Sequence, residues 1–426
     1  MQFQVQRSKL SGQVRIPGSK SHTIRGLIIA TLAEGTSTLN RPLRSSDTES
    51  CIAACRAMGA TFNDEDDDKW QISGTGGFPE SAGKTVDVRN SGTTLFLAIT
   101  AAALGNTPLE LTGDEQLRKR SAGPLLRALR ELGAEANARG DNDCPPIVVC
   151  GPIKGGKISI ECPTSQYLSS LLIGCPLAEG QTEIDVPLLN EKPYVQMTCG
   201  WLREMGIEFE NSEDLQHFVV PGGQRYAAFE QPIPADFSSG TFFLVGAAVT
   251  GSELLLAGLD MEDTQGDKAV VGMLERMGCD ITTESFGIRI KGPDKLIGGE
   301  FDLNATPDAL PAMAVAGALA EGETRLVNVP QAREKETDRI AVMASELQKL
   351  GADVEEMPDG LVLRESELVG TTVDGWADHR VVMALAVAGM AAAGTTTITT
   401  AEAVEITFPQ FADLMRRAGA ELREIQ

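Results

Sequence analysis

The chain has 426 residues, a length that exceeds one ordinary hydrophobic core and predicts two or three domains. Hydrophobic residues make up 42% of the chain and 44 residues are glycine, which excludes a disordered or fibrous protein. The formal net charge of -23 argues against a broad surface for nucleic acid or for an anionic membrane.

The first segment, "MQFQVQRSKLSG", lacks the basic and apolar stretches of a signal peptide. The longest apolar run, "VVMALAVAGMAAA", is too short to span a bilayer, so we expect a cytoplasmic protein without a membrane partner. The eight cysteines form no CxxC pair, and we expect them to be small core residues rather than disulfides or metal ligands.

A short phrase then recurs six times: a small polar residue, an apolar helix, a glycine and a Thr-rich strand. The copies, of which "SKSHTIRGLIIATLAEGTSTLN" is the first, begin near residues 19, 90, 164, 238, 306 and 378. An amphipathic helix ending in a glycine cap follows each copy, and these cap glycines are residues 59, 133, 206, 278, 351 and 419. Because both series keep a spacing of 68 to 75 residues, the chain is expected to hold six copies of one unit.

The first helix of each copy, for instance "LIIATLA", is apolar on almost every face, which predicts a helix buried on all sides. The second helix is amphipathic and should cover the outside. Six such copies suggest two three-copy domains with sheets outside and buried helices within, joined near "QRYAAFEQPIPADF".

The buried helices start with Ser, Thr, Asn or Asp, and their free N–H groups and dipoles favour anions. Each of these residues alone is equally typical of a plain N-cap. The balance shifts because cations recur at matching places, namely Lys20, Arg25, Arg118, Arg120, Lys335, Arg339 and Arg380. We therefore expect a site for anionic ligands.

The motifs "PGSKSHTIR", "RNSGTT", "TGDEQLRKR", "TSQYL", "EKPY", "TPDALPAM", "EKETDR" and "ADHR" resemble, in order, those of the 5-enolpyruvylshikimate-3-phosphate synthases (3-phosphoshikimate 1-carboxyvinyltransferases). The resemblance covers essentially the whole chain. It implies an inside-out α/β barrel fold, with two domains of three βαβαββ units each and an active site in the cleft between them. One domain is expected to comprise residues 16–232, and the other residues 1–15 with 233–426.

The resemblance also implies a reaction. The enolpyruvyl group of phosphoenolpyruvate is transferred to the 5-hydroxyl of shikimate 3-phosphate, with release of phosphate and without cofactor or metal, by an expected monomer that binds small molecules and no nucleic acid. The implied catalytic residues are Lys20, Asp308 and Glu336, with Asp308 as the base for the hydroxyl and the other two acting at the methylene carbon. The implied phosphoenolpyruvate ligands are Lys20, Arg120, Arg339 and Arg380. The implied acceptor ligands are Ser21 and Arg25 for its carboxylate, Thr164, Ser165 and Lys335 for its phosphate, and Gln166 for its ring. Further implied binding residues are Asn90, Gly92, Thr93, Tyr194 and Gln331.

Three positions depart from the family pattern. Phe96 and Ile406 stand where the family usually has Arg and Lys, and Glu191 stands at a usual serine. A carboxylate beside a phosphate is repulsive, so Glu191 should point away, bind a counter-charge such as Lys192, or indicate another acceptor. Arg89 and Arg118 are candidates to replace the lost cations.

Several alternatives remain at this point. The chain is either the shikimate-pathway enzyme, a paralogue that acts on another hydroxy acid, with or without a phosphate, or a non-catalytic relative. UDP-N-acetylglucosamine enolpyruvyl transferase shares the fold but uses a reactive cysteine in the loop that matches "GDEQLRKRSAG", which contains none here. Taken alone, "EKETDR" is typical of a solvated helix start, Asp308 and Asp378 of N-caps, and His379 of either a titrating or an oriented structural residue.

Overall fold

The structure is a computed structural model that describes residues 1–426. The chain forms two compact units. We call Met1–Pro17 with Pro234–Gln426 the discontinuous unit, and Gly18–Ile233 the continuous unit. Each unit buries its own large hydrophobic core, and the two cores share no residue.

Six four-stranded sheets, three in each unit, follow one design: a parallel pair of strands followed by two antiparallel neighbours. The sheets of the continuous unit are β14(Glu230–Pro232)-β3(Thr36–Asn40)-β5(Lys69–Ser73)-β4(Thr61–Asp66), β6(Thr85–Asp87)-β7(Leu109–Thr112)-β9(Ile147–Cys150)-β8(Glu135–Ala138) and β10(Gly156–Cys162)-β11(Thr182–Leu189)-β13(His217–Val220)-β12(Glu210–Asn211). Those of the discontinuous unit are β2(Gln13–Arg15)-β15(Glu253–Ala257)-β17(Gly287–Lys291)-β16(Asp280–Glu284), β18(Glu300–Asp302)-β19(Glu323–Val327)-β21(Gly360–Arg364)-β20(Asp353–Met357) and β22(Thr372–Asp374)-β23(Thr395–Thr399)-β1(Gln2–Gln6)-β24(Glu421–Ile425).

Each sheet is accompanied by two helices. The first helices of the six copies are α1 (Lys20–Leu32), α3 (Gly92–Ala102), α5 (Ser165–Gly174), α7 (Phe237–Thr250), α9 (Leu310–Leu319) and α11 (His379–Ala391). The second helices are α2 (Ser46–Ala57), α4 (Gly123–Glu131), α6 (Lys192–Glu204), α8 (Ala269–Arg276), α10 (Arg339–Lys349) and α12 (Phe411–Arg417).

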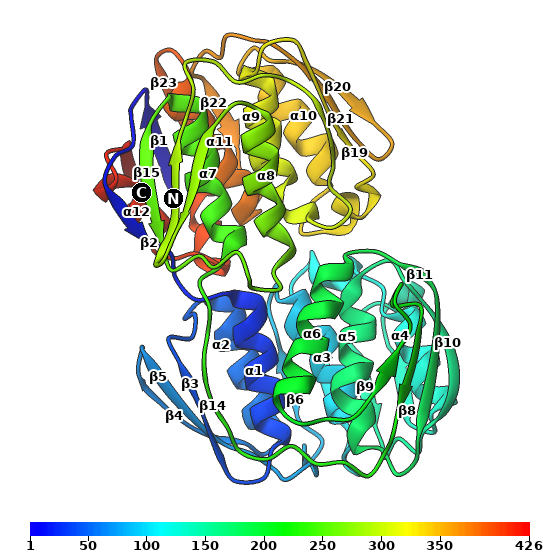
Figure 1. The fold of residues 1–426 in the computed structure, drawn as a ribbon. Coiled ribbons are helices and arrows are strands. Elements are labelled where there is room, and N and C mark those ends of the chain that lie inside the picture. Colours follow the sequence, from blue (N-terminus) through cyan, green and yellow to red (C-terminus); the bar gives the residue numbers. More distant parts are fainter. The chain divides into compact units, whose positions relative to one another are not determined.

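The first helices are buried on all sides, as their uniformly apolar sequences predict. Every residue of α3 is buried, and only the last residue of α11 is not. In the discontinuous unit α7, α9 and α11 lie side by side with sheets around them (Figure 1). The second helices bury one side only, as Leu125 and Leu129 of α4 do while Arg127 and Arg130 stay exposed. The predicted fold, with sheets outside and helices inside, is confirmed.

The six predicted cap glycines all have positive φ, from 71° to 109°, the left-handed region that glycine enters without a steric penalty. This shared backbone conformation explains why a glycine recurs at the end of every second helix.

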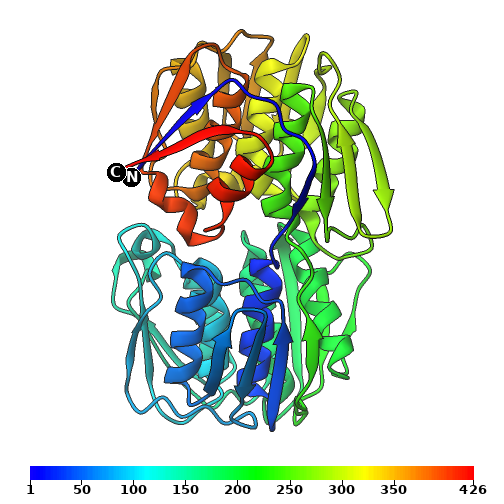
Figure 2. The ribbon, with the colours of Figure 1, turned by 90° about the vertical axis from the view of Figure 1, so that its left-hand side faces the viewer.

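The copies are not each continuous in sequence, which the periodicity did not predict. The first sheet takes its outer strand, β14, from the end of the continuous unit. The N-terminal segment supplies β2 to the sheet of β15 and β1 to the last sheet, where β1 lies between β23 and β24. The two chain ends therefore meet on one sheet (Figure 2).

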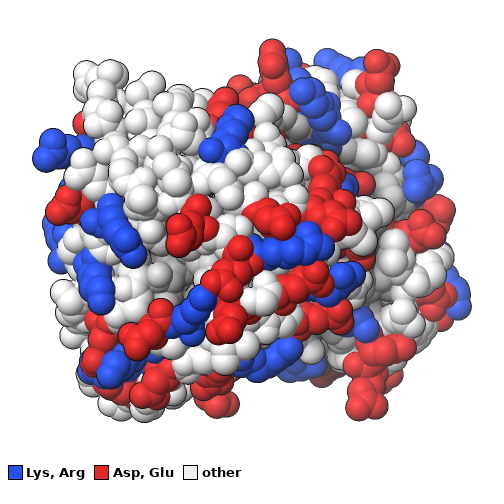
Figure 3. Space-filling view, turned by 90° about the horizontal axis from the view of Figure 1, so that it is seen from above, with Lys and Arg blue, Asp and Glu red and all other residues white.

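Acidic and basic side chains are interspersed on the face seen from above (Figure 3). None of the helices combines the length and apolar character needed to cross a membrane.

Candidate active site

A cluster of charged side chains lies at the N-terminal ends of α9, α10 and α11 in the discontinuous unit. Arg339, the first residue of α10, is at its centre and is 1% exposed. Its guanidinium donates to Asp308 (2.7 Å), to Glu336 and to both carboxylate oxygens of Asp378 (2.8 and 3.2 Å). Arg380 forms a second ion pair with Asp308, at 2.8 Å. Two cations and three carboxylates are thus held in mutual contact.

Helix capping fixes this cluster. Asp378 is the N-cap of α11 and accepts the backbone N–H of Arg380 at 2.9 Å. Asp338 caps α10 by accepting the N–H of Ala341 at 3.1 Å. Asp308 stands in a short 3-10 turn, Pro307–Ala309, that leads into α9. The N-cap expectation for Asp378 is therefore correct, but the same carboxylate also pairs with an arginine.

Burial alone would favour neutral groups here, but the partners outweigh it. Burial lowers the pKa of Arg339, whereas Asp378, Glu336 and Asp308 raise it, and the net pKa lies above its ordinary value. Burial opposes ionisation of Asp378, yet Arg339 brings the pKa of that carboxyl below its usual value. Removing one partner of such a buried pair typically costs about 3 to 5 kcal/mol, because the other charge stays buried. The motif "EKETDR" is therefore no solvated helix start.

Asp267 is a buried carboxyl next to this cluster that the sequence did not single out. Ser238 and Thr306 donate their hydroxyls to it. Burial, and then the negative charge of Asp308, raise the pKa of Asp267. Because Thr306 immediately precedes the turn that carries Asp308, Asp267 anchors that turn.

His379 follows Asp378 and is buried. Neither ring nitrogen has a hydrogen-bond partner. Burial lowers its pKa to about 3, so the imidazole is neutral at physiological pH. The sequence allowed either a titrating or a structural role for His379, and the prediction that it titrates near neutral pH is wrong.

The remaining predicted residues of this unit lie beside the cluster. Gln331 is in the 3-10 turn Pro330–Glu334 and is buried, and its amide donates to the carbonyl of Asn304 at 3.0 Å. Lys335 ends the same turn and is half-buried. Gln331 thus lies eight residues and Lys335 four residues before Arg339 in the chain.

In the continuous unit, Lys20 is the first residue of α1. Its ammonium lies 3.1 Å from a carboxylate oxygen of Asp47, in the first turn of α2. The Asp47 side chain is 5% exposed, and no motif in the sequence marks it as a site residue. An acidic residue in the first turn of a helix is common, because it compensates the helix dipole. The position of Asp47 in the sequence therefore does not reveal its ion pair with Lys20.

Arg25, one turn along α1, is 1% exposed, and its hydrogen-bond partners are hydroxyl and carbonyl oxygens. Its guanidinium donates to the hydroxyls of Thr198 (2.9 Å) and Ser169 (3.3 Å), and to the carbonyls of Ser21 (3.1 Å) and Tyr194 (3.0 Å). Burial lowers its pKa to about 10, so it is still charged at neutral pH. Ser21 and Tyr194 thus contribute backbone oxygens to a buried arginine.

Three predicted polar residues, Asn90, Thr93 and Gln166, tie the start of α3 to its neighbours. Thr93 accepts a hydrogen bond from the Gln166 amide at 2.9 Å. Asn90, which precedes α3, donates to Asp114 at 2.8 Å and to Gln116 at 2.6 Å. Asp114 and Gln116 belong to the predicted motif "TGDEQLRKR" and position its loop against α3.

Gly92 is the first residue of α3 and lies against Arg120. A Cβ at this position would be 2.6 Å from Nη1 of Arg120, closer than a carbon atom can approach. The glycine is therefore required by the position of that guanidinium. Arg118 and Arg89, the candidates for replacing lost cations, are exposed, and Arg118 donates to Thr112 at 3.3 Å.

Two of the three departures are core substitutions. Phe96 is buried and meets the ring of Tyr167 edge-on, with 5.0 Å between ring centroids. Ile406 packs against the apolar core of the discontinuous unit. Neither side chain offers a polar group to a ligand.

Glu191, the third departure, points into the predicted anion site. Its Oε2 accepts the Ser165 hydroxyl at 2.8 Å, the Ser165 backbone N–H at 3.1 Å and the Thr164 hydroxyl at 3.3 Å. Glu191 is 2% exposed. Of the three alternatives considered for Glu191, that it points away is therefore wrong.

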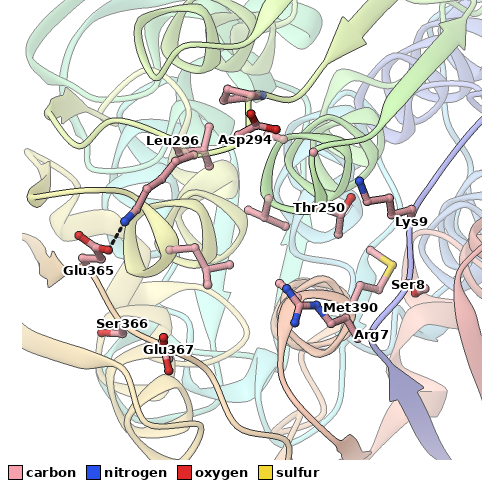
Figure 4. A pocket seen from close by; sticks show the side chains of 17 residues that line it. Arg7, Ser8, Lys9, Thr250, Asp294, Leu296, Glu365, Ser366, Glu367 and Met390 are labelled. Atoms are coloured by element: carbon pink, nitrogen blue, oxygen red, sulfur yellow. Dashed lines mark hydrogen bonds and ion pairs between the residues drawn. The ribbon is translucent and has the colours of Figure 1, made fainter.

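Two other features fall outside these clusters. A cavity of about 560 Å³ lies at the C-terminal ends of α7, α9 and α11, lined among others by Arg7, Lys9 and Lys295 (Figure 4). It is at the opposite end of these helices from Arg339, and Lys295 is paired with Glu365 there.

The only grouping with metal-ligand geometry is Glu183, Asp185 and His217 on β11 and β13. Lys157 donates to Glu183 at 2.7 Å and lies 3.5 Å from Asp185, so one ammonium already contacts both carboxylates of this trio and offsets part of their charge.

Comparisons with known proteins show which family the chain resembles over its length. The family model described as EPSP synthase (3-phosphoshikimate 1-carboxyvinyltransferase) matches residues 5–415. The chain is 54% identical to the 3-phosphoshikimate 1-carboxyvinyltransferase of Acetivibrio thermocellus over 422 residues, or 99% of each chain, and 42% identical to that of Methanococcoides burtonii, again over 99% of each. A solved EPSP synthase from Acinetobacter baumannii superposes with a TM-score of 0.84 at 28% identity, covering 99% of this chain and all of the other.

Proposed function

Because the chain belongs to the EPSP synthase (3-phosphoshikimate 1-carboxyvinyltransferase) family, we propose that the two residue clusters described above carry out the family's reaction. The protein is a carboxyvinyltransferase of the shikimate pathway, with phosphoenolpyruvate and shikimate 3-phosphate as substrates. What remains to be proposed is the role of each residue.

The contact between Asp308 and two arginines carries the assignment. Arg339 donates to this carboxylate and Arg380 forms an ion pair with it, so it is held in place beside the cations that would bind an anionic substrate. We assign Asp308 to accept the proton of the acceptor hydroxyl as its oxygen attacks the central carbon of phosphoenolpyruvate.

A proton must also be added to the methylene carbon and later removed, as the carbon–oxygen bond to phosphate breaks. We assign these transfers to Glu336 and Lys20. Glu336 forms an ion pair with Arg339, which also pairs with Asp308, and the ion pair with Asp47 positions Lys20. The phosphate leaves with the bridging oxygen, and the double bond reforms on the transferred group.

The other residues bind and orient. We assign Arg120, Arg339 and Arg380 to the phosphoenolpyruvate carboxylate and phosphate, because a guanidinium contacts an oxyanion through two N–H groups. Arg25 with Ser21 would bind the acceptor carboxylate, and Thr164, Ser165 and Lys335 its phosphate. Supporting acceptor contacts are assigned to Asn90, Gly92, Thr93, Gln166, Tyr194 and Gln331.

Turnover of phosphoenolpyruvate and shikimate 3-phosphate tests these assignments. Asp308→Asn and Glu336→Gln keep the size of the side chain, so each should retain substrate binding within about threefold while lowering kcat by roughly 10² or more. Glu334→Gln is the matched control, because Glu334 is exposed in the turn that precedes Glu336. Wild-type turnover in either variant would remove that residue from the chemistry.

We also propose that the enzyme works as a cytoplasmic monomer. All eight cysteines are free and seven are buried, as in a reducing compartment, and each unit has its own core. Light scattering at micromolar concentration measures the mass, and a dimer mass would contradict the proposal.

A further inference from the structure

The carboxylate of Glu191 occupies a site built for an anion. Two hydroxyls and one backbone N–H, all at the start of α5, converge on one of its oxygens within 3.3 Å. The N-terminus of this ten-residue helix adds the positive end of its dipole.

The surroundings of Glu191 also supply positive potential. Arg25 is buried among hydroxyls and carbonyls, and Glu191 is one of the groups whose negative charge raises the pKa of Arg25 against burial. The carboxylate therefore compensates a buried cation as well as the helix end.

Two costs show that Glu191 is more than a helix cap. Its backbone lies in the left-handed region, with φ 56° and ψ 40°, which a residue with a Cβ adopts only at an energetic cost. Its charged side chain is almost fully buried. A cap of α6 needs neither feature, since serine or threonine at this position would cap the helix without a buried charge.

We propose that Glu191 is an internal competitor of the acceptor phosphate, occupying the phosphate position in the free protein and leaving it when shikimate 3-phosphate binds. This inference rests on the proposed function, because Thr164 and Ser165 are the residues assigned to that phosphate. Two anions cannot share the same three donors, so binding requires the Glu191 side chain to rotate away. The competition weakens the affinity for the phosphorylated acceptor and keeps free inorganic anions out of the site.

Titration calorimetry without phosphoenolpyruvate tests the proposal on the whole protein. The variants are Glu191→Ser, which restores a donor, and Glu191→Gln, which keeps the shape but removes the charge. Glu131→Ser is the control, because it removes one exposed carboxylate from the same unit. The probes are shikimate 3-phosphate, unphosphorylated shikimate and sodium sulfate.

Shikimate 3-phosphate should bind at least about tenfold more tightly to Glu191→Ser than to the wild type, and Glu191→Gln should lie between them. Shikimate should bind equally to all four proteins. Sulfate should compete with shikimate 3-phosphate in Glu191→Ser and leave the wild type unaffected. Unchanged or weaker binding of shikimate 3-phosphate in both variants would overturn the proposal.

Two further results would also overturn it. Weaker binding of plain shikimate to both variants would make Glu191 a direct ligand of the acceptor. A lower melting temperature in both variants with unchanged affinities would make it a structural cap. If the wild type does not turn over shikimate 3-phosphate, the proposed function fails, and the gain of sulfate binding in Glu191→Ser still decides the role of Glu191.

Discussion

His379 should make the protein sensitive to mild acid. The ring is buried, has no hydrogen-bond partner and has a pKa of about 3 in the folded chain. In the unfolded chain its pKa is the ordinary value near 6.5. Between these two values the unfolded state binds a proton that the folded state does not, so the free energy of unfolding falls as the pH falls.

The magnitude follows from the two pKa values. Each pH unit below 6.5 is worth about 1.4 kcal/mol, so the loss should be about 2 kcal/mol at pH 5 and should reach about 5 kcal/mol near pH 3. Little of it should be present at pH 7.5.

The charged neighbours of His379 shift its pKa in opposite directions. Asp378 lies 3.9 Å from Nδ1 and, with Glu336, favours protonation, whereas Arg380 and Arg339 oppose it. Asp378 is already the acceptor for Arg339 and for the start of α11, and 3.9 Å is too long for a hydrogen bond. Burial is the largest influence, and it lowers the pKa.

His379→Phe keeps a ring in the same space, breaks no hydrogen bond and removes the titration. Urea unfolding followed by circular dichroism at pH 7.5 and pH 5.0 should show about 2 kcal/mol less pH dependence in this variant than in the wild type. The difference is compared with that of His217→Phe, which removes a half-buried imidazole whose Nδ1 lies 2.8 Å from Asp185. If the free energy of unfolding falls by the same amount from pH 7.5 to pH 5.0 in the wild type and in His379→Phe, the reasoning is refuted.

Two further predictions concern the continuous unit. Gly92→Ala should leave the melting temperature within about 3 °C of the wild type, because the added Cβ displaces only the flexible end of the Arg120 side chain. The displacement should raise the KM for phosphoenolpyruvate at least about tenfold. An unchanged KM would show that Arg120 does not bind that substrate. Asp47→Asn removes the carboxylate that lies 3.1 Å from the Lys20 ammonium. It should lower kcat about tenfold while the KM for shikimate 3-phosphate changes little. A changed KM with a normal kcat would instead assign the Lys20–Asp47 pair to substrate binding.

The sequence predicted the parts of the fold that depend on local physics. A helix such as α3 that is apolar on every side must be buried on every side, and glycines such as Gly59 and Gly351 mark helix ends that require a positive φ. Strand exchange between copies was not predictable from periodicity, because β14 and β1 look the same in sequence whether they pair with near or distant partners.

Some residues of the candidate site could be predicted from the sequence and others could not. Arg339 was predictable, because a cation beside a buried helix start is unusual in an acidic chain. Asp47 and Asp267 were not, since an acidic residue early in a helix or a turn is common and its partner lies tens of residues away. The sequence identified Glu191 as anomalous, but its direction depends on the backbone twist at that residue, which no neighbour in sequence dictates.

The strand β1 has a consequence for biosynthesis. It is made first, yet its hydrogen-bonding partners β23 and β24 lie near the other end of the chain. At about 5 to 20 residues per second the ribosome needs roughly 20 to 80 s to synthesise the residues between them. The continuous unit contains all the strands of its own three sheets and is complete well before that time. We therefore expect nascent chains in which the middle of the protein is folded while its first strand is still unpaired, a substrate for chaperones that bind extended N-terminal segments.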